Sequence, residues 1–359
     1  MKINKIFIII ALFLIIPYVQ AQEIGLDAFI ETNSFIYKWS PFLDTGELRY
    51  GSDSFRFKIG ENYIVYNYKE KITGSSISRK NGAVTLDKKT ADMILQKAGF
   101  SSSATAVAPR TSRNNENLQP SGHRVAAILI DPGHGGRDPG AIGRHEVKGK
   151  PFVINEKDIV LDIALELNKM LISTYKDKKI VLTRNNDTYL LLEDRVEKGN
   201  SVKLDRNEAI IMVSIHANAS LNKNAKGFEV WYLPPDYRRN IIDEKSVDPS
   251  IRDILPILNT MLEEEFTIES ILLAQNILDG LGASLGDQSP SRGSKEETWF
   301  VVKNSKMPSV LVEVGFVTNE EEAQKLADKA YLKKITEGIY NGIKKFIDNI
   351  ETINFSGER

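Results

Sequence analysis

The stretch that decides the fold is RVAAILIDPGHGG, residues 124–136, in which an apolar run at 125–130 ends in a glycine-rich loop. An apolar run bounded by turn residues is typical of a strand, and a helical pattern follows at 156–172 with its apolar residues on one face. Further strand candidates lie at residues 179–182, 209–215, 228–233 and 310–314. This alternation predicts an α/β domain with a mostly parallel sheet flanked by helices.

The chain has only four histidines, His123, His134, His145 and His216. His134 lies in the glycine-rich loop, and His216 directly follows the strand candidate at 209–215. Sites in open α/β sheets gather beyond the carboxyl ends of the strands, so these two side chains are expected to meet. Two imidazoles and one carboxylate make the protein ligand set of a catalytic zinc, with a fourth position left to water. A phosphate-binding loop is disfavoured, because the loop lacks the Lys-Ser/Thr pair of a P-loop.

Glu313 interrupts an apolar strand candidate, VLVEV at 310–314, where an unpaired carboxylate would be costly. One interpretation is a general base that takes a proton from a metal-activated water. The other is a buried ion pair, with Lys303 or Arg184 as its cation. We adopt the first as the working hypothesis.

Four motifs occur in a fixed order: DPGHGG at 131–136, NEKD at 155–158, SIHAN at 214–218 and VEVGF at 312–316. Together they resemble the zinc-dependent N-acetylmuramoyl-L-alanine amidases of the type 3 family, over about 125–350. The resemblance implies hydrolysis of the amide bond between N-acetylmuramic acid and the L-alanine of the peptidoglycan stem peptide. It also implies that His134, Glu156 and His216 hold one Zn²⁺ and that Glu313 is catalytic.

Each of these roles has a rival interpretation. An acid at a helix start, such as Glu156, is favoured by the helix dipole in any protein. Asp138 and Asn218 are expected to support the loops or to contact substrate. The alternatives for the whole protein are a zinc-dependent peptidoglycan peptidase and a non-catalytic wall-binding protein.

Residues 1–21 are predicted to be a secretory signal. Lys2 and Lys5 precede an apolar run at 6–16, and Val19-Gln20-Ala21 resembles a cleavage site. The run is shorter than the ~20 residues that cross a bilayer.

No cysteine is present, which excludes a lipid anchor on cysteine, a thiol nucleophile and any disulfide. We therefore expect an exported protein, periplasmic or associated with the cell wall. The net charge of −1 gives no argument for nucleic acid.

Residues 22–100 are predicted to form a small strand-rich accessory module, with polar and apolar residues alternating at 47–50, 54–58 and 62–66. The module resembles the N-terminal domain of copper amine oxidases, and it implies no copper because it lacks His and Cys. Its aromatic residues are either core or a surface for stacking on glycan. Residues 101–124 contain hardly any large apolar residue and are predicted to be a flexible linker.

Residues 236–278 form an insert that is too long for a simple connection. It resembles the insert of cell-division amidases, in which a helix covers the cleft and an acid blocks the zinc. The resemblance implies autoinhibition, relieved by a protein activator that acts on the insert. The expected helix lies at about 253–265, and the candidate acids are Glu263, Glu264, Glu265 and Glu269. The alternative is a pair of extra surface helices.

Overall fold

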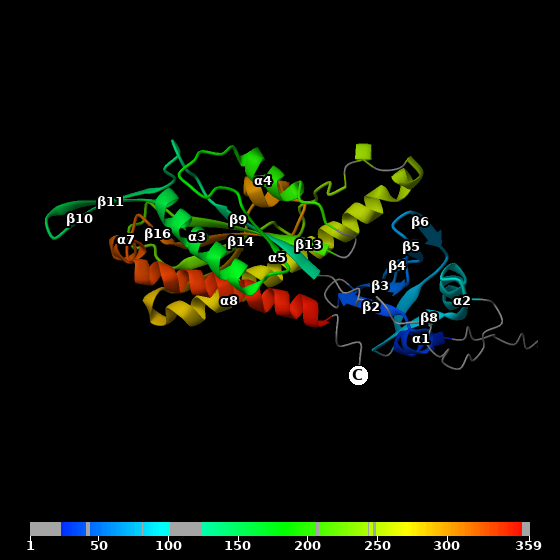
Figure 1. Cartoon of the computed structure of the whole chain (residues 1–359). Coiled ribbons are helices and arrows are strands. Elements are labelled where there is room, and N and C mark those ends of the chain that lie inside the picture. The colour runs from blue at the N-terminus through cyan, green and yellow to red at the C-terminus, as the bar shows by residue number, and fades with distance from the viewer. Residues whose placement is uncertain are drawn as a thin grey trace, which may run out of the picture.

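The structure is a computed structural model that describes residues 23–40, 44–80, 82–100, 124–204, 208–242, 244–246 and 249–353 (Figure 1). The predicted signal at 1–21 lies outside the described residues. So does the predicted linker at 101–124, apart from Arg124, which begins a strand. Among the described helices, none has both the length and the apolar character that crossing a membrane requires.

A six-stranded sheet forms the centre of the C-terminal part, in the order β12-β9-β13-β16-β14-β15. Its strands are β9 (Arg124–Pro132), β12 (Lys179–Leu182), β13 (Glu208–Asn218), β14 (Phe228–Tyr232), β15 (Ser291–Glu296) and β16 (Ser309–Phe316). The first four strands in this order are parallel. β14 runs antiparallel to β16, and β15 is parallel to β14.

The prediction of a mostly parallel sheet is therefore wrong, because the sheet is mixed. The reason lies in the connection between β13 and β14, which consists of residues 219–227 alone. A parallel return needs a crossover of about a dozen residues or more, so the chain comes back in the opposite direction.

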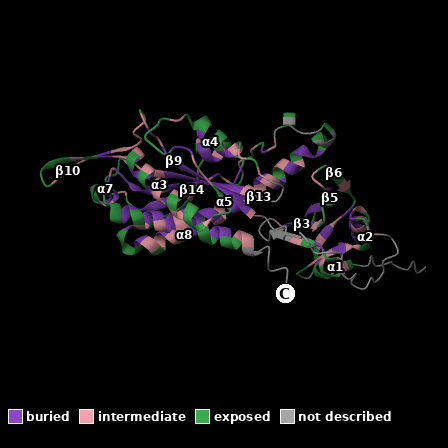
Figure 2. Ribbon diagram, in the orientation of Figure 1, coloured by how far each residue is buried: buried purple, intermediate pink, exposed green. Residues whose placement is uncertain are grey.

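Helices cover both faces of the sheet (Figure 1). One face carries α3 (Glu156–Thr174), α5 (Leu255–Leu285) and α8 (Lys329–Ile353), which share its apolar core. The other face carries α4 (Leu192–Asn200) and α6 (Phe300–Asn304). The central strands are buried between these layers (Figure 2). A hairpin of β10 (Ile142–Val147) and β11 (Lys150–Asn155) projects from one end, near the short helix α7 (Glu320–Leu326).

The second half of α5 belongs to the core of this domain. α5 crosses α8 so closely that a Cβ on Gly280 would lie 2.2 Å from the Gly338 carbonyl oxygen. A Cβ on Gly342 would lie 2.5 Å from the Ile277 Cα. The predicted insert thus ends inside one long helix, whose carboxyl half is a structural element of the fold.

The N-terminal part is rich in strands, as predicted. Five antiparallel strands form a meander: β2 (Ile36–Ser40), β3 (Thr45–Tyr50), β4 (Asp53–Lys58), β5 (Tyr63–Tyr66) and β6 (Glu70–Thr73). A smaller sheet contains β1 (Glu23–Gly25), β7 (Ile77–Lys80) and β8 (Ala83–Asp87), and two helices complete the part, α1 (Leu26–Asn33) and α2 (Lys88–Lys97). Phe55 and Phe57 are fully buried, which places them in the core rather than on a glycan-binding face. The resemblance to copper amine oxidases stays a prediction.

The first half of α5 leaves the six-stranded sheet and packs against the N-terminal module (Figure 1). Arg56 of β4 forms a buried ion pair with Glu265, and Lys58 lies 2.9 Å from Glu264. Beside these pairs an apolar cluster joins the two parts: Val65, Ile254, Leu258 and Met261. We call this contact the module–helix interface.

Candidate metal centre

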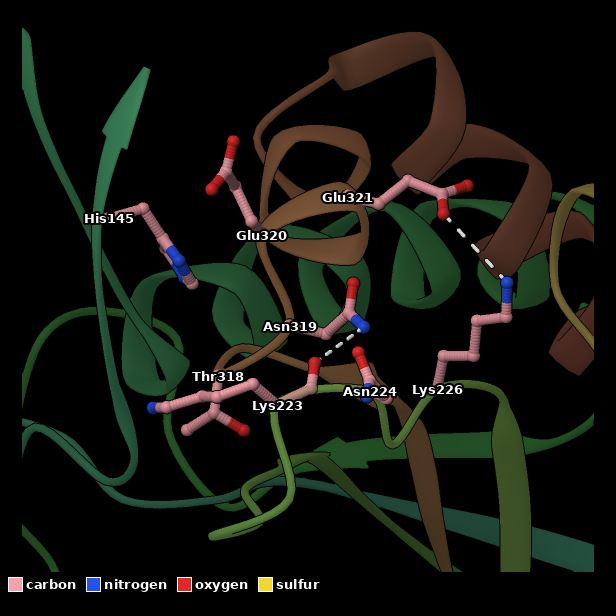
Figure 3. Close-up of a pocket in the computed structure, with 8 residues that line it drawn as sticks. All are labelled: His145, Lys223, Asn224, Lys226, Thr318, Asn319, Glu320 and Glu321. Atoms are coloured by element: carbon pink, nitrogen blue, oxygen red, sulfur yellow. Dashed lines mark hydrogen bonds and ion pairs between the residues drawn. The ribbon is translucent and has the colours of Figure 1, made fainter. Parts of the chain in front are cut away.

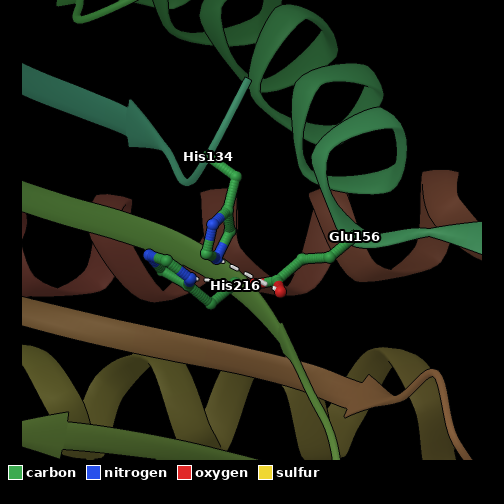
Figure 4. A group of neighbouring side chains, drawn as sticks. All are labelled: His134, Glu156 and His216. Atoms are coloured by element: carbon green, nitrogen blue, oxygen red, sulfur yellow. Dashed lines mark hydrogen bonds and ion pairs between the residues drawn. The ribbon is translucent and has the colours of Figure 1, made fainter. Parts of the chain in front are cut away.

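The three predicted ligands converge at the carboxyl ends of the parallel strands (Figure 4). His134 follows β9, Glu156 begins α3, and His216 lies in β13. One ligand atom from each lies within 4.8 Å of the others. Nε2 of His134 is 3.2 Å from one Glu156 oxygen, and Nδ1 of His216 is 2.8 Å from the other.

Glu156 is buried and held by the backbone on both of its oxygens. The N–H groups of Ala141 and Ala217 donate to them, at 2.8 and 3.0 Å. Burial alone would raise the pKa of Glu156, but hydrogen bonds with His134 and His216 outweigh it and hold the pKa well below its usual range. The carboxylate is therefore ionised in the metal-free protein, as a metal ligand must be.

His134 is fixed from both sides. Its backbone has a φ of 56°, in the left-handed region where residues other than glycine are uncommon. On the side away from Glu156, Nδ1 lies 2.8 Å from an Asp138 oxygen. A carboxylate on the second ring nitrogen is the usual way in which a ligating histidine is oriented. The expectation that Asp138 supports this loop agrees with the geometry.

Two buried arginines hold the backbone of the same loop. Arg184 donates to the carbonyls of Pro132 and Gly133, at 3.1 and 2.7 Å. Arg195 donates to the Pro132 carbonyl at 2.7 Å and also binds Asp131 at 2.8 Å. Sequence reasoning missed Arg195. The signal was Asp131, a carboxylate at the end of a buried strand, which requires a charged partner.

Two glycines leave room for the cluster. A Cβ on Gly133 would lie 2.3 Å from the His216 ring, and a Cβ on Gly140 would lie 2.5 Å from a Glu156 oxygen. Any side chain there would displace a candidate ligand. Two imidazoles and an ionised carboxylate around such a cradle fit a zinc ion in donor type and number.

Glu313 lies in β16 directly beside His216 of β13. Within the described part of the chain, its buried Oε2 has no hydrogen-bond partner. Burial is the main reason that the pKa of Glu313 is raised well above its ordinary value, and the charges of Glu156 and Glu229 add to it. The alternative ion pair is not supported: Arg184 binds backbone carbonyls, and Lys303 lies over the Tyr237 ring.

Glu229 extends this row of polar side chains by one more strand, since it pairs with Glu313 across β14 and β16. It is buried, and Asn218 donates to its Oε1 at 2.7 Å. Its Oε2 accepts from Arg292 at 2.7 Å and from Lys295. Burial would raise the pKa of Glu229, but these two cations lower it. Sequence reasoning missed this cluster, although a Glu between apolar residues at 228–231 was a signal.

His145 does not join the metal cluster. It lies in the β10–β11 hairpin, where Nε2 is 2.8 Å from the Val317 carbonyl oxygen. It lines a polar surface pocket beside the loop that precedes α7 (Figure 3). The other residues that line the pocket are Lys223, Asn224, Lys226, Thr318, Asn319, Glu320 and Glu321. His123 lies outside the described residues.

The predicted blocking acids lie at the opposite end of the sheet. Glu263 is buried against Arg239, at 2.9 Å, and Arg239 also donates to the carbonyl of Ser305, shortly before β16 begins. Glu264 and Glu265 bind the N-terminal module. The prediction that one of these three acids occupies the metal position is therefore wrong for this structure. Glu269 is buried in α5.

The sequence profile of the N-acetylmuramoyl-L-alanine amidases matches residues 128–345, which is more than half of the chain. These residues include all the side chains of the metal cluster and Glu313. The chain therefore belongs to the N-acetylmuramoyl-L-alanine amidase family.

Two relatives agree with this assignment in sequence. N-acetylmuramoyl-L-alanine amidase LytC of Bacillus subtilis is 34% identical over 215 residues, which are 60% of this chain and 34% of LytC. A putative N-acetylmuramoyl-L-alanine amidase of Buchnera aphidicola is 33% identical over 232 residues, 63% of this chain and 99% of the relative. One similar solved structure is that of N-acetylmuramoyl-L-alanine amidase AmiC2 of Nostoc punctiforme, which is 29% identical in sequence. The match covers 62% of this chain and 97% of the AmiC2 chain, with a TM-score of 0.46.

Proposed function

We propose that this protein hydrolyses the amide bond between N-acetylmuramic acid and L-alanine in peptidoglycan, with one zinc ion held by His134, Glu156 and His216. The observation that carries the proposal is the convergence of these three side chains beside Glu313, whose Oε2 has no partner among the described residues. When bound, the zinc ion polarises the amide carbonyl and lowers the pKa of water.

The protein's own residues supply the remaining steps. Glu313 accepts a proton from the attacking water on Oε2 and passes it to the leaving amide nitrogen, so that the amine departs neutral. Asp138 holds the His134 ring, and Arg184 and Arg195 hold the loop that carries it. The water oxygen bonds to the lactyl carbonyl carbon and the C–N bond breaks, so that the stem peptide leaves with the amine of its L-alanine and the lactyl group stays on muramic acid as a free carboxylate.

The test uses purified sacculi and the mature protein, with and without a chelator. Intact stem peptides released from the glycan, identified by mass spectrometry, are the expected products. Activity lost to the chelator should return with zinc. Peptide fragments cut within the stem would favour the peptidase alternative, and binding without any release would favour a wall-binding protein.

Two further parts of the proposal concern location and control. Export to the periplasm or the cell wall follows from the substrate and from the predicted signal at 1–21.

An activator that acts on residues 236–278 also stays a proposal, and the module–helix interface restricts how it could bind. It would have to bind α5 while Glu264 and Glu265 are held by Lys58 and Arg56, or displace them.

A further inference from the structure

The polar row on the sheet reaches beyond the metal centre to the edge strand β15. His216 pairs with Glu313, Glu313 pairs with Glu229, and Glu229 binds Arg292 and Lys295 of β15. Side chains that pair directly across strands point to the same face of a sheet. The two cations therefore lie on the face, and at the end of the sheet, where substrate must meet Glu313.

Glu229 does not fully neutralise the positive charges of Arg292 and Lys295. It supplies one negative charge for two cations, and its Oε1 is already occupied by Asn218. Among the described residues, the only hydrogen bond of the Arg292 guanidinium runs from Nε to Glu229, so its two terminal nitrogens can still donate. The Arg292 side chain is 36% exposed and that of Lys295 31%, so both are open to a ligand. A planar pair of guanidinium donors suits a carboxylate.

The spacing fits a peptide that extends from the scissile bond. The strand of Glu229 lies two steps from that of His216, about 10 Å at 4.8 Å for each step. An extended chain covers about 3.3–3.6 Å for each residue, so two residues of a stem peptide and one charge-assisted hydrogen bond of about 2.8 Å together span this distance. The glycan side offers no such charge, because the lactyl carboxyl of muramic acid is itself part of the amide.

We infer that Arg292 and Lys295 bind a free carboxylate of the stem peptide and select acidic stems over amidated ones, with Glu229 as the positioning residue. This inference rests on the proposed function. The site would take a peptide that leaves a free α-carboxylate within the first residues after the scissile amide. Because the contact lies away from the reacting atoms, it should act on KM more than on kcat.

The experiment compares two muramyl tetrapeptides that differ only at the second stem residue, which carries either a free α-carboxylate or its amide. The parent should show a roughly tenfold lower KM for the acid, as expected for one charge-assisted contact. Arg292→Gln and Lys295→Met should each remove most of this preference, mainly through the KM of the acid. Lys345→Met is the matched control, since this cation lies on α8 and binds Asp279.

A second measurement keeps the inference testable if a variant is poorly active. Calorimetry with the released acid and amide peptides on the zinc-loaded protein should give the same order of affinity, with the difference lost in Arg292→Gln. Equal affinity of the parent for both peptides, or an equal loss on both in Arg292→Gln, would overturn the inference and leave only a supporting role for Arg292. If the parent cleaves neither muramyl peptide, the proposed function fails, and the calorimetry still decides the inference.

Discussion

At the amino ends of the parallel strands, Glu263 and Glu265 are buried, and each faces an arginine, Arg239 or Arg56. At the carboxyl ends, Glu156 is equally buried, but its side-chain partners are two imidazoles. Glu313 keeps one buried oxygen that pairs with nothing in the described part of the chain. The same residue type is therefore neutralised at one end of the sheet and left available for a cation and a proton at the other.

This difference separates structure from chemistry. A buried carboxylate that is paired with an arginine has a structural role. Removal of either partner leaves an unpaired buried charge and destabilises the fold. A buried carboxylate without a partner, such as Glu313, costs stability when it is ionised, and such costs collect at functional sites. We therefore expect substitutions at the carboxyl end to change activity and those at the amino end to change stability.

The largest expected effect belongs to Glu313→Gln. The change keeps the shape of the side chain and removes the proton acceptor, so turnover of sacculi should fall on the order of 10²-fold or more. Zinc content, measured by atomic emission, should stay that of the parent. An active Glu313→Gln enzyme would remove this carboxylate from the mechanism.

Disruption of the ion pair between Arg56 and Glu265, at the amino ends of the strands, should leave zinc binding and hydrolysis unchanged. Arg56→Glu sets a carboxylate against Glu265 in a buried interface, and the stability of the folded chain should fall on the order of 3 kcal/mol. Hydrogen exchange should show faster exchange at residues 255–265, while zinc content and hydrolysis stay near the parent values.

The matched control for this break is Lys97→Glu, at an exposed ion pair with Glu70 on the same module. It should cost about 1 kcal/mol or less. Adding Glu265→Arg to Arg56→Glu should restore much of the protection at 255–265. Normal exchange in Arg56→Glu alone would mean that this ion pair does not hold the module to the helix.

The crossing of α5 and α8 can be tested with one glycine inside the contact and one outside it. Gly342→Ala pushes a Cβ against Ile277, and overpacking of this kind costs about 1–3 kcal/mol. Gly282→Ala meets nothing within 4 Å and should instead stabilise the helix, by up to about 1 kcal/mol. Urea unfolding of both variants gives the comparison. A Gly342→Ala variant that is as stable as the parent, or that is stabilised as much as Gly282→Ala, would contradict the close crossing of α5 and α8.

The smallest effect is a gain in stability at the active site. The pKa of Glu313 is raised in the folded protein, so its ionisation opposes folding, and this cost grows as pH rises above the ordinary glutamate range. Glu313→Gln removes the cost. The metal-free variant should therefore be more stable than the metal-free parent at pH 8, with a smaller difference at pH 4, as measured by urea unfolding with a chelator present. The same difference at both values would show that ionisation of Glu313 does not oppose folding.

Patterns close together in the sequence predicted much of this molecule. The apolar runs before His134 and around Glu313 indicated strands, and the ordered motifs brought His134, Glu156 and His216 to one edge. These signals are local, since a strand followed by a loop needs only its own residues to be recognised. The helix α3 begins at Glu156, as its pattern indicated.

The remaining features depend on contacts between distant residues. The direction of β14 follows from the length of the connection before it, which the pattern of β14 itself does not contain. Arg56 and Glu265 are 209 positions apart, so the sequence around one residue does not indicate that the other is its partner. The run Glu263-Glu264-Glu265 was interpreted by its resemblance to a helix that blocks the metal. In the structure, Glu264 and Glu265 instead pair with cations of the N-terminal module, and Glu263 pairs with Arg239.

The central claim is that one zinc ion is held by His134, Glu156 and His216, and the most direct test is the metal content of variants purified after loading with zinc. The parent and Glu313→Gln should each retain one zinc ion per chain. The double variant with His134→Ala and His216→Ala should retain none while the N-terminal module stays folded. Stoichiometric zinc in this double variant would contradict the account.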